Sequence, residues 1–358
     1  MVEREPVSQA AQSVDLTLLS VVVVNFNGMD SLPATLESLS RQLPDMSAVI
    51  VSDDGSTDES REWVSRHYPA CRVVGPPCHS GRPTVVRNAG LREVTTPYAF
   101  LTDNDIEFPA GSLSGLLQAV MADDLVLCAT PRLLNGLDAR YLYGDGNQLH
   151  FLCLSGEGSR GQRVEDRPPG QPFPTFAGGI MMIRMSHARA IGLFDEGYLH
   201  GWADDSEFQI RGRLAGFRSL HVPAVWMLHD DVQHGTERAL AQFVNRYRLL
   251  FTVYSRRSLL LLSPSLLFFE IVALFGASLK SMAGLRLRAM ADTIRGWPEL
   301  LQQRRRCQRT RRVRDGQLLV GGPFQLPAAV AGDPLVSWAQ RVLRRAFDLN
   351  WRLVRRWL

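Results

Sequence analysis

Lysine and paired cysteine are what this sequence has least of. Lys280 is the sole lysine among 358 residues, so arginine supplies almost all of the positive charge. The five cysteines form no C-x-x-C pair and stand beside no closely spaced histidines, which argues against a zinc site and favours a reduced, cytoplasmic compartment. No repeat of fixed period occurs along the chain, which argues against a solenoid.

Long uninterrupted apolar runs are also missing. Residues 1–15 carry four charged side chains and no apolar run, so we interpret 1–17 as a loose N-terminus, neither signal peptide nor anchor. The strongest apolar stretch, 259–279, is interrupted by two serines, Pro264 and Glu270. These interruptions argue against a clean membrane span of about 20 residues and favour a surface-lying helix or a helical hairpin.

Charge is divided unevenly along the chain. From Arg256 to the end there are 19 basic and 6 acidic residues, so a tail of net +13 follows a body of net −9. A basic tail of this kind indicates contact with an anionic surface, membrane or nucleic acid, but the acidic body argues against a nucleic-acid track. The final segment resembles an interfacial amphipathic helix, with arginines beside an apolar stripe of Leu343, Phe347, Trp351, Val354 and Leu358.

The first two hundred residues alternate between strand and helix patterns. Residues 18–24 form a continuous apolar and β-branched run, which is typical of a strand buried on both faces of a sheet. Ser31 is expected to cap the first helix, and Ser56 with Glu59 to form a capping box for the second. The alternation predicts an α/β domain with a mostly parallel sheet. Further strands are expected at 48–52, 73–74, 98–102 and within 178–185, a helix at 83–93, and a long, partly mobile insertion at 135–174.

Two acidic clusters follow predicted strands, where open parallel sheets bind their ligands. In Asp103-Asn104-Asp105, two carboxylates two residues apart can face one divalent cation and a diphosphate, although a polar turn is the structural alternative. In Asp53-Asp54, one carboxylate could accept hydrogen bonds from a nucleobase and a ribose, although part of this motif is explained by turn formation.

A third acidic cluster opens a predicted helix after Trp202. Asp204, Asp205 and Glu207 exceed what helix capping requires, so one of them is a candidate general base for an acceptor hydroxyl. His229, which follows the apolar run 222–228, could complete the metal site through a ring nitrogen, or could be structural.

The order of these motifs resembles inverting glycosyltransferases of family 2, which have the GT-A fold. The resemblance covers roughly residues 18–230. Asp204 stands where the family usually has Glu, and Glu207 where Asp is common, so the charge is kept. The matching pieces are VVVVNFNG at 21–28, VSDDGSTD at 51–58, GRPTVVRNAG at 81–90, FLTDND at 100–105, FAGGIMMIR at 176–184, GLFDEGY at 192–198, ADDSEFQIRGRLAG at 203–216 and VPAVWMLH at 222–229.

The resemblance implies roles for individual residues. Asp103 and Asp105 would form the D-x-D element, with Asp105 directly on a Mn²⁺ or Mg²⁺ ion, and Asp205 would be the catalytic base. Arg82 or Arg87 would lie near the uracil or phosphate. The nucleotide-sugar side would comprise Asn25, Asp53, Asp54, Arg82, Arg87, Asp103, Asn104, Gly178 and Gly179, and the acceptor side Trp202 and Asp204.

These observations predict a GT-A catalytic domain at 18–237 and a helical, basic, membrane-associating region at 238–358. The expected activity is transfer of a sugar, with inversion, from a UDP-, dTDP- or GDP-sugar to a glycan or lipid-linked acceptor at the cytoplasmic face of a bacterial inner membrane. Two alternatives stay open: a catalytically silent scaffold of the same fold, and a sugar nucleotidyltransferase. The latter would need a glycine-rich basic loop after the first strand, where this chain has Asn25-Phe26-Asn27-Gly28.

Overall fold

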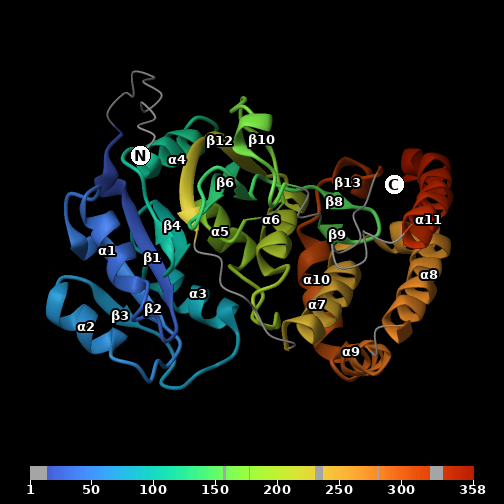
Figure 1. The fold of residues 1–358 in the computed structure, drawn as a ribbon, viewed down its shortest axis with the longest axis horizontal. Helices are drawn as coiled ribbons and strands as arrows, with labels where there is room; N and C mark the ends of the chain where they lie inside the picture. Colours follow the sequence, from blue (N-terminus) through green and yellow to red (C-terminus); the bar gives the residue numbers. More distant parts are fainter. Residues whose placement is uncertain (1–13, 156–158, 177, 230–236, 280–281, 323–333) are drawn as a thin grey trace.

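The computed structural model describes residues 14–155, 159–176, 178–229, 237–279, 282–322 and 334–358. A 10-stranded mixed sheet forms one half of the molecule, and long helices form the other (Figure 1). The main strand order is β10-β12-β6-β11-β4-β1-β2-β3. The principal strands are β1 (Leu19–Asn25), β2 (Val49–Asp53), β3 (Arg72–Val74), β4 (Tyr98–Asp103), β6 (Val126–Asn135), β11 (Met181–Arg184) and β12 (Arg218–His229).

The three longest strand pairings in this sheet are parallel: β1 with β2, β1 with β4, and β6 with β12. Strands β3, β2, β1 and β4 pair in parallel, and β11 runs antiparallel between β4 and β6. The result is the expected α/β architecture with a mostly parallel sheet. Three short strands pair at its periphery: β5 (Ile106–Glu107) with β12, β7 (Leu142–Gly144) with β6, and β10 (Phe173–Pro174) with β12.

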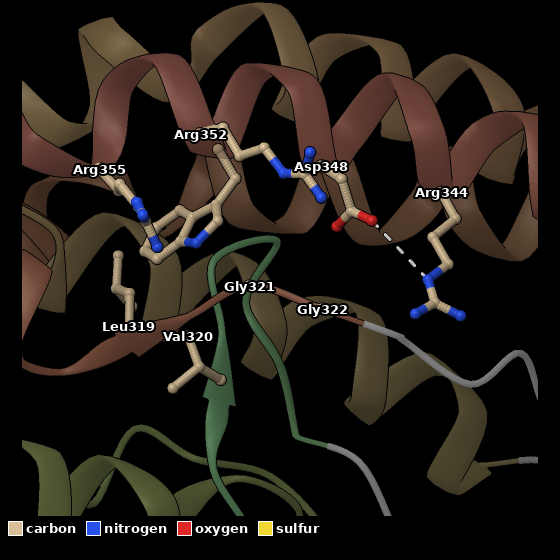
Figure 2. Close-up of a pocket in the computed structure, with 9 residues that line it drawn as sticks. Leu319, Val320, Gly321, Gly322, Arg344, Asp348, Arg352 and Arg355 are labelled. Carbon is tan, nitrogen blue, oxygen red and sulfur yellow. Dashed lines mark ion pairs between the residues drawn. The ribbon is translucent and has the colours of Figure 1, made fainter.

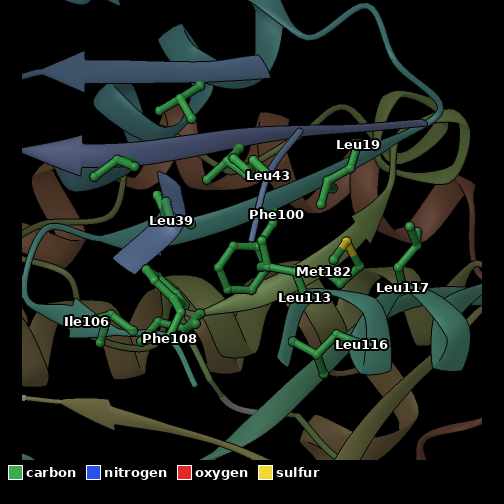
Figure 3. Close-up of a cluster of buried hydrophobic side chains, with 14 of the residues drawn as sticks. Leu19, Leu39, Leu43, Phe100, Ile106, Phe108, Leu113, Leu116, Leu117 and Met182 are labelled. Carbon is green, nitrogen blue, oxygen red and sulfur yellow. The ribbon is translucent and has the colours of Figure 1, made fainter. Parts of the chain in front are cut away.

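Helices cover both faces of the sheet, which explains the unbroken apolar run of the first strand. Val21 and Val23 face one hydrophobic cluster with α1 and α4, and Val22 faces another with α3, α5 and α6. Phe100 lies at the centre of the first cluster, edge-on to Phe108 with ring centroids 5.6 Å apart (Figure 3). These helices are α1 (Leu32–Ser40), α2 (Ser60–His67), α3 (Pro83–Glu93), α4 (Ser112–Met121), α5 (Met185–Ile191) and α6 (Asp204–Leu214).

Both predicted helix caps are wrong in detail. Ser31 makes no capping hydrogen bond at the start of α1. Helix α2 begins at Ser60, and the Ser56 hydroxyl instead donates to the Asp53 carboxylate at 2.6 Å. The Asp58 carboxylate accepts from the Ser60 N–H at 3.1 Å, so the polar residues of this motif serve the strand end and the turn.

The N-terminus is more ordered than expected where the structure describes it. Asp15 caps a short 3₁₀ turn, Leu16–Leu18, and Val14 and Leu16 pack against the first hydrophobic cluster. Residues 1–13 of the predicted loose segment lie outside the described residues. The described part of the predicted insertion 135–174 contains four short strands, so its backbone is partly held by pairing.

The C-terminal half is helical, as predicted, and has its own hydrophobic core. This core also contains Ile210 and Leu214 of α6, so the two halves share apolar contacts. The small sheet β13-β8-β9 borders it. The elements are β8 (Leu149–His150), β9 (Leu154–Ser155), β13 (Leu319–Val320), α7 (Glu237–Val253), α8 (Arg256–Leu279), α9 (Ala283–Arg295), α10 (Trp297–Arg309) and α11 (Pro334–Val354).

Two predictions about this half are corrected. The stretch 259–279 is no hairpin, because α8 is one continuous helix that contains Pro264. The predicted interfacial stripe faces the protein: Phe347 and Leu358 are buried, and the remaining three stripe residues pack against the same core. An apolar helix face that packs against neighbouring helices stabilises the fold, and the same face cannot contact lipid at the same time.

Within the described part of the chain, one helix is long and apolar enough to cross a membrane, Arg256–Ser278. Only 17% of its apolar window is buried inside the protein.

Candidate active site

Strand pairing brings the first two acidic motifs to one edge of the sheet. Asn25 pairs with Asp53 across β1 and β2, and Val24 pairs with Asp103 across β1 and β4. The strands are parallel, so all of these carboxyl ends meet at the same edge. Residues far apart in the sequence therefore lie close together at one edge of the sheet.

Asn25 links the two motifs through its side-chain amide. Its Nδ2 donates to Asp53 Oδ2 at 2.8 Å, and its Oδ1 accepts from Asn104 Nδ2 at 2.7 Å. Asp53 is only 1% exposed and also accepts from the Ser56 N–H at 2.9 Å. Asp53 thus holds the turn through hydrogen bonds inside the protein, and Asp54 is the carboxylate nearer to solvent.

Asp54 lies beside two stacked aromatic rings, Phe26 and His79, and this corner of the site was not predicted from the sequence. Its carboxylate lies 2.8 Å from His79 Nδ1 and accepts from the Ser80 N–H at 3.0 Å. The His79 ring stacks on Phe26, with centroids 3.9 Å apart and planes 21° apart. Phe26 is 42% exposed, so an apolar ring face stands beside a carboxylate, which suits a nucleobase. The sequence feature that could have indicated this stacking surface is Phe26, the aromatic side chain directly after Asn25.

The two arginines expected near the nucleotide have different positions. Arg82 is exposed just before α3. Arg87 is buried inside the site, where its guanidinium contacts Asp204 and lies 3.7 Å from Asp103. A Cβ added at Gly179 would stand 3.0 Å from Arg87 Nη2, so the glycine leaves room for this arginine. Arg87 therefore bridges the D-x-D element and the acidic helix.

Asp103, Asp105 and His229 form the candidate metal site. One ligand atom from each can be chosen so that all lie within 4.8 Å of one another, and all three residues are partly buried. The register of β5 and β12 pairs His229 with Ile106, which places the imidazole beside the D-x-D turn. Two carboxylates and an imidazole nitrogen suit Mn²⁺, and carboxylates also suit Mg²⁺.

The three acids of α6 have distinct surroundings. Asp204 is 2% exposed and paired with Arg87, and Glu207 is fully buried in a two-point ion pair with Arg211. Asp205 is the partly exposed member of the three. Two of the acids are thus neutralised by arginine, and one has access to the site.

Asp205 is held by backbone donors on both oxygens. Its Oδ2 accepts from the Gly178 N–H at 2.7 Å, and its Oδ1 from the Ser206 N–H at 2.7 Å. Burial and the neighbouring Asp204 carboxylate raise the pKa of Asp205 above its ordinary value, while the Gly178 N–H and Arg87 act in the opposite direction. Gly178 adopts φ +121°, a backbone conformation that favours glycine. A raised pKa moves a carboxylate toward the range of an effective general base.

Trp202, expected on the acceptor side, precedes this helix and is partly buried against the C-terminal core. Its backbone carbonyl accepts a hydrogen bond from Asn245 Nδ2 of α7 at 2.8 Å. The same amide donates to the Leu199 carbonyl at 2.7 Å. The C-terminal half thus holds the loop that leads into the acidic helix.

Comparison with known proteins points to one family. Residues 20–192 match the family model described as glycosyl transferase family 2. The chain is also similar to two curated proteins of Mycobacterium tuberculosis. It is 28% identical over 218 residues to a pre-mycofactocin glycosyltransferase, covering 60% of this chain and 43% of that protein. It is 25% identical over 246 residues to an N-acetylglucosaminyl-diphospho-decaprenol L-rhamnosyltransferase, covering 62% of this chain and 78% of that protein.

Among solved structures, the fold is similar to a crystal structure of GalNAc-T7 with UDP, GalNAc and Mn²⁺. The TM-score is 0.53 at 19% identity, over 67% of this chain and 48% of that one, which supports the fold alone. The match over residues 20–192 and these relatives support a glycosyltransferase of family 2, and the fold is that of a GT-A domain. It spans less than half the length of the first curated relative that it matches.

Proposed function

We propose that this protein is an inverting glycosyltransferase that moves a sugar from a nucleoside diphosphate to a hydroxyl of a glycan or lipid-linked acceptor. The observation that carries the proposal is the position of Asp205. It is the one acid of its cluster with access to the site, and Arg87 connects its neighbour Asp204 to Asp103. A candidate base and a candidate metal site therefore share one edge of the sheet.

The nucleoside would occupy the corner around Asp54. The Phe26 ring offers a stacking face, and the Asp54 carboxylate can accept from a base or ribose. Asn25 and Asn104 hold this corner to the D-x-D turn. Asp103, Asp105 and His229 would hold Mn²⁺ or Mg²⁺, which would neutralise the diphosphate as it leaves.

In the reaction, the acceptor hydroxyl transfers its proton to the Asp205 carboxylate. The acceptor oxygen forms a bond to the anomeric carbon, while the bond from that carbon to the diphosphate oxygen breaks and the electron pair leaves with the diphosphate. Direct displacement from the face opposite the leaving group inverts the anomeric centre. Gly178 donates to Asp205 and so fixes the base in position.

The catalytic domain is assigned to 18–237, and 238–358 to a region that binds anionic membrane. Exposed apolar side chains follow one line along α8, namely Leu260, Leu267, Ile271 and Phe275, and another on the last helical turns, namely Leu349, Leu353 and Trp357. On the packed side of α11, Arg344, Arg352 and Arg355 border a hollow of about 490 Å³ with Trp351, and Arg344 lies 3.7 Å from Asp348 (Figure 2). Apolar side chains beside arginines suit the interface of an anionic bilayer.

Two features support an acceptor on that membrane. One relative is named for a decaprenol-linked substrate, and the basic half of this chain directly contacts the loop before α6. Assembly of a cell-surface polysaccharide or glycolipid at the cytoplasmic face of a bacterial inner membrane fits both.

The test is a panel of UDP-, dTDP- and GDP-sugars with Mn²⁺ or Mg²⁺, with donor hydrolysis and donor binding measured. One donor should bind in a metal-dependent manner that a chelator abolishes and Asp105→Ala greatly weakens. Binding without turnover on any acceptor would favour the silent scaffold. Production of a nucleotide sugar from a sugar phosphate and nucleoside triphosphate would favour the nucleotidyltransferase.

A further inference from the structure

Tyr143 stacks on a candidate metal ligand from outside the metal site. Its ring and that of His229 have centroids 4.0 Å apart and planes only 10° apart. Tyr143 lies in β7, which pairs with the end of β6 through Leu134 and Leu142. The insertion that follows β6 thus brings an aromatic ring onto the imidazole beside Asp103 and Asp105.

The outer face of Tyr143 carries a cation. The Arg160 guanidinium carbon lies 4.4 Å from the centre of the tyrosine ring. His229 and Arg160 are both too close to that ring to share one face, so the three side chains form a stack with Tyr143 in the middle.

Backbone pairing holds Arg160 in this position. The Gly161 N–H donates to the Leu142 carbonyl at 2.8 Å, and the Leu142 N–H donates to the Gln162 carbonyl at 2.9 Å. The strand that carries Tyr143 and the segment that carries Arg160 are therefore joined by two backbone hydrogen bonds next to the stack.

We propose that Tyr143 is a positioning residue for His229, and that it sets the affinity of the metal site. An imidazole can bind a metal only in a narrow range of ring orientations, and a parallel ring at van der Waals distance restricts rotation of the histidine side chain. The Arg160 cation over the opposite face stabilises the tyrosine ring in turn. This inference rests on the proposed metal site and adds a residue from the insertion to it.

The experiment measures Mn²⁺ binding to the full chain, by the electron paramagnetic resonance signal of free Mn²⁺. Loss of an outer-shell partner typically weakens metal binding about 10- to 100-fold, so Tyr143→Ala should weaken it by about 10-fold or more. Tyr143→Phe keeps the ring and should bind within about 2-fold of wild type, since the stack needs no hydroxyl. Tyr141→Ala, which removes a nearby exposed tyrosine, is the matched control and should bind normally.

A double-mutant cycle distinguishes positioning from a general structural role. If Tyr143 acts through His229, then Tyr143→Ala should weaken Mn²⁺ binding in the wild-type background and cause no further loss in a His229→Ala background. An equal loss in both backgrounds, or a loss that accompanies a large drop in the thermal midpoint and is not rescued by Tyr143→Phe, overturns the inference.

The same measurements separate this inference from the proposed function. Normal Mn²⁺ binding in Tyr143→Ala, with clear loss in Asp105→Ala and His229→Ala, overturns the positioning role alone. Normal binding in all three variants overturns the metal site and the positioning role together.

Discussion

Replacing Asp205 by Asn tests the proposed base directly. General base catalysis contributes about 10²- to 10⁴-fold in rate, which corresponds to about 3–5.5 kcal/mol of transition-state stabilisation. Asn keeps the shape of the side chain and loses its basicity. The expected result is a fall in kcat of that size with donor affinity within about 2-fold of wild type, because the residue serves the acceptor side.

The surroundings of Asp205 predict a second, smaller effect on stability. Both of its oxygens accept from backbone N–H groups, Gly178 and Ser206. An amide NH₂ cannot accept, so one backbone donor loses its partner, at a cost of about 1–3 kcal/mol. Thermal unfolding of the variant should show this modest loss, and kcat must be measured below the new midpoint.

The matched variants are Asp204→Asn and Glu207→Gln. Each would remove the nearest carboxylate from a buried arginine, Arg87 or Arg211, and such losses cost about 3–5 kcal/mol. These two should therefore lose more stability than Asp205→Asn. A near-normal kcat in Asp205→Asn, or a product that retains the anomeric configuration by NMR, would refute the reasoning.

Two further predictions concern pH and membrane binding. Arg87→Met removes a cation that lowers the pKa of Asp205, so the pKa of Asp205 should rise further. Because the base works only when ionised, the acidic limb of the kcat–pH profile should move to higher pH. An acidic limb that does not move would contradict the assignment of Asp205 as the base. Binding of the full chain to anionic vesicles should weaken in high salt, since each arginine near an anionic leaflet contributes about 1 kcal/mol, and Leu353→Asp should reduce it without lowering the thermal midpoint. Phe347→Ala, on the opposite stripe of α11, should instead cost about 3–5 kcal/mol of stability. If all of the protein stays on the membrane in both high salt and carbonate, α8 is better described as a membrane span.

The sequence alone predicted the strands β1 to β4 and the edge of the sheet at which they end. A continuous β-branched run such as 18–24 requires cover on both faces, and helices cover both faces in the structure. Acidic residues directly after strands must meet at one edge when the strands are parallel, which is why Asp53 and Asp103 could be grouped from local patterns.

Only the tertiary structure separated residues whose local patterns are the same. The three acids of α6 have the same local pattern, that of acidic residues in a first helical turn. Contacts that only folding creates neutralise two of them, Asp204 through Arg87 and Glu207 through Arg211. The two apolar stripes of α11 have similar composition, and packing against the C-terminal core decides which one is buried. Tyr143 gave no signal, because its partner His229 lies on another strand and stacking depends on register rather than on spacing in the sequence.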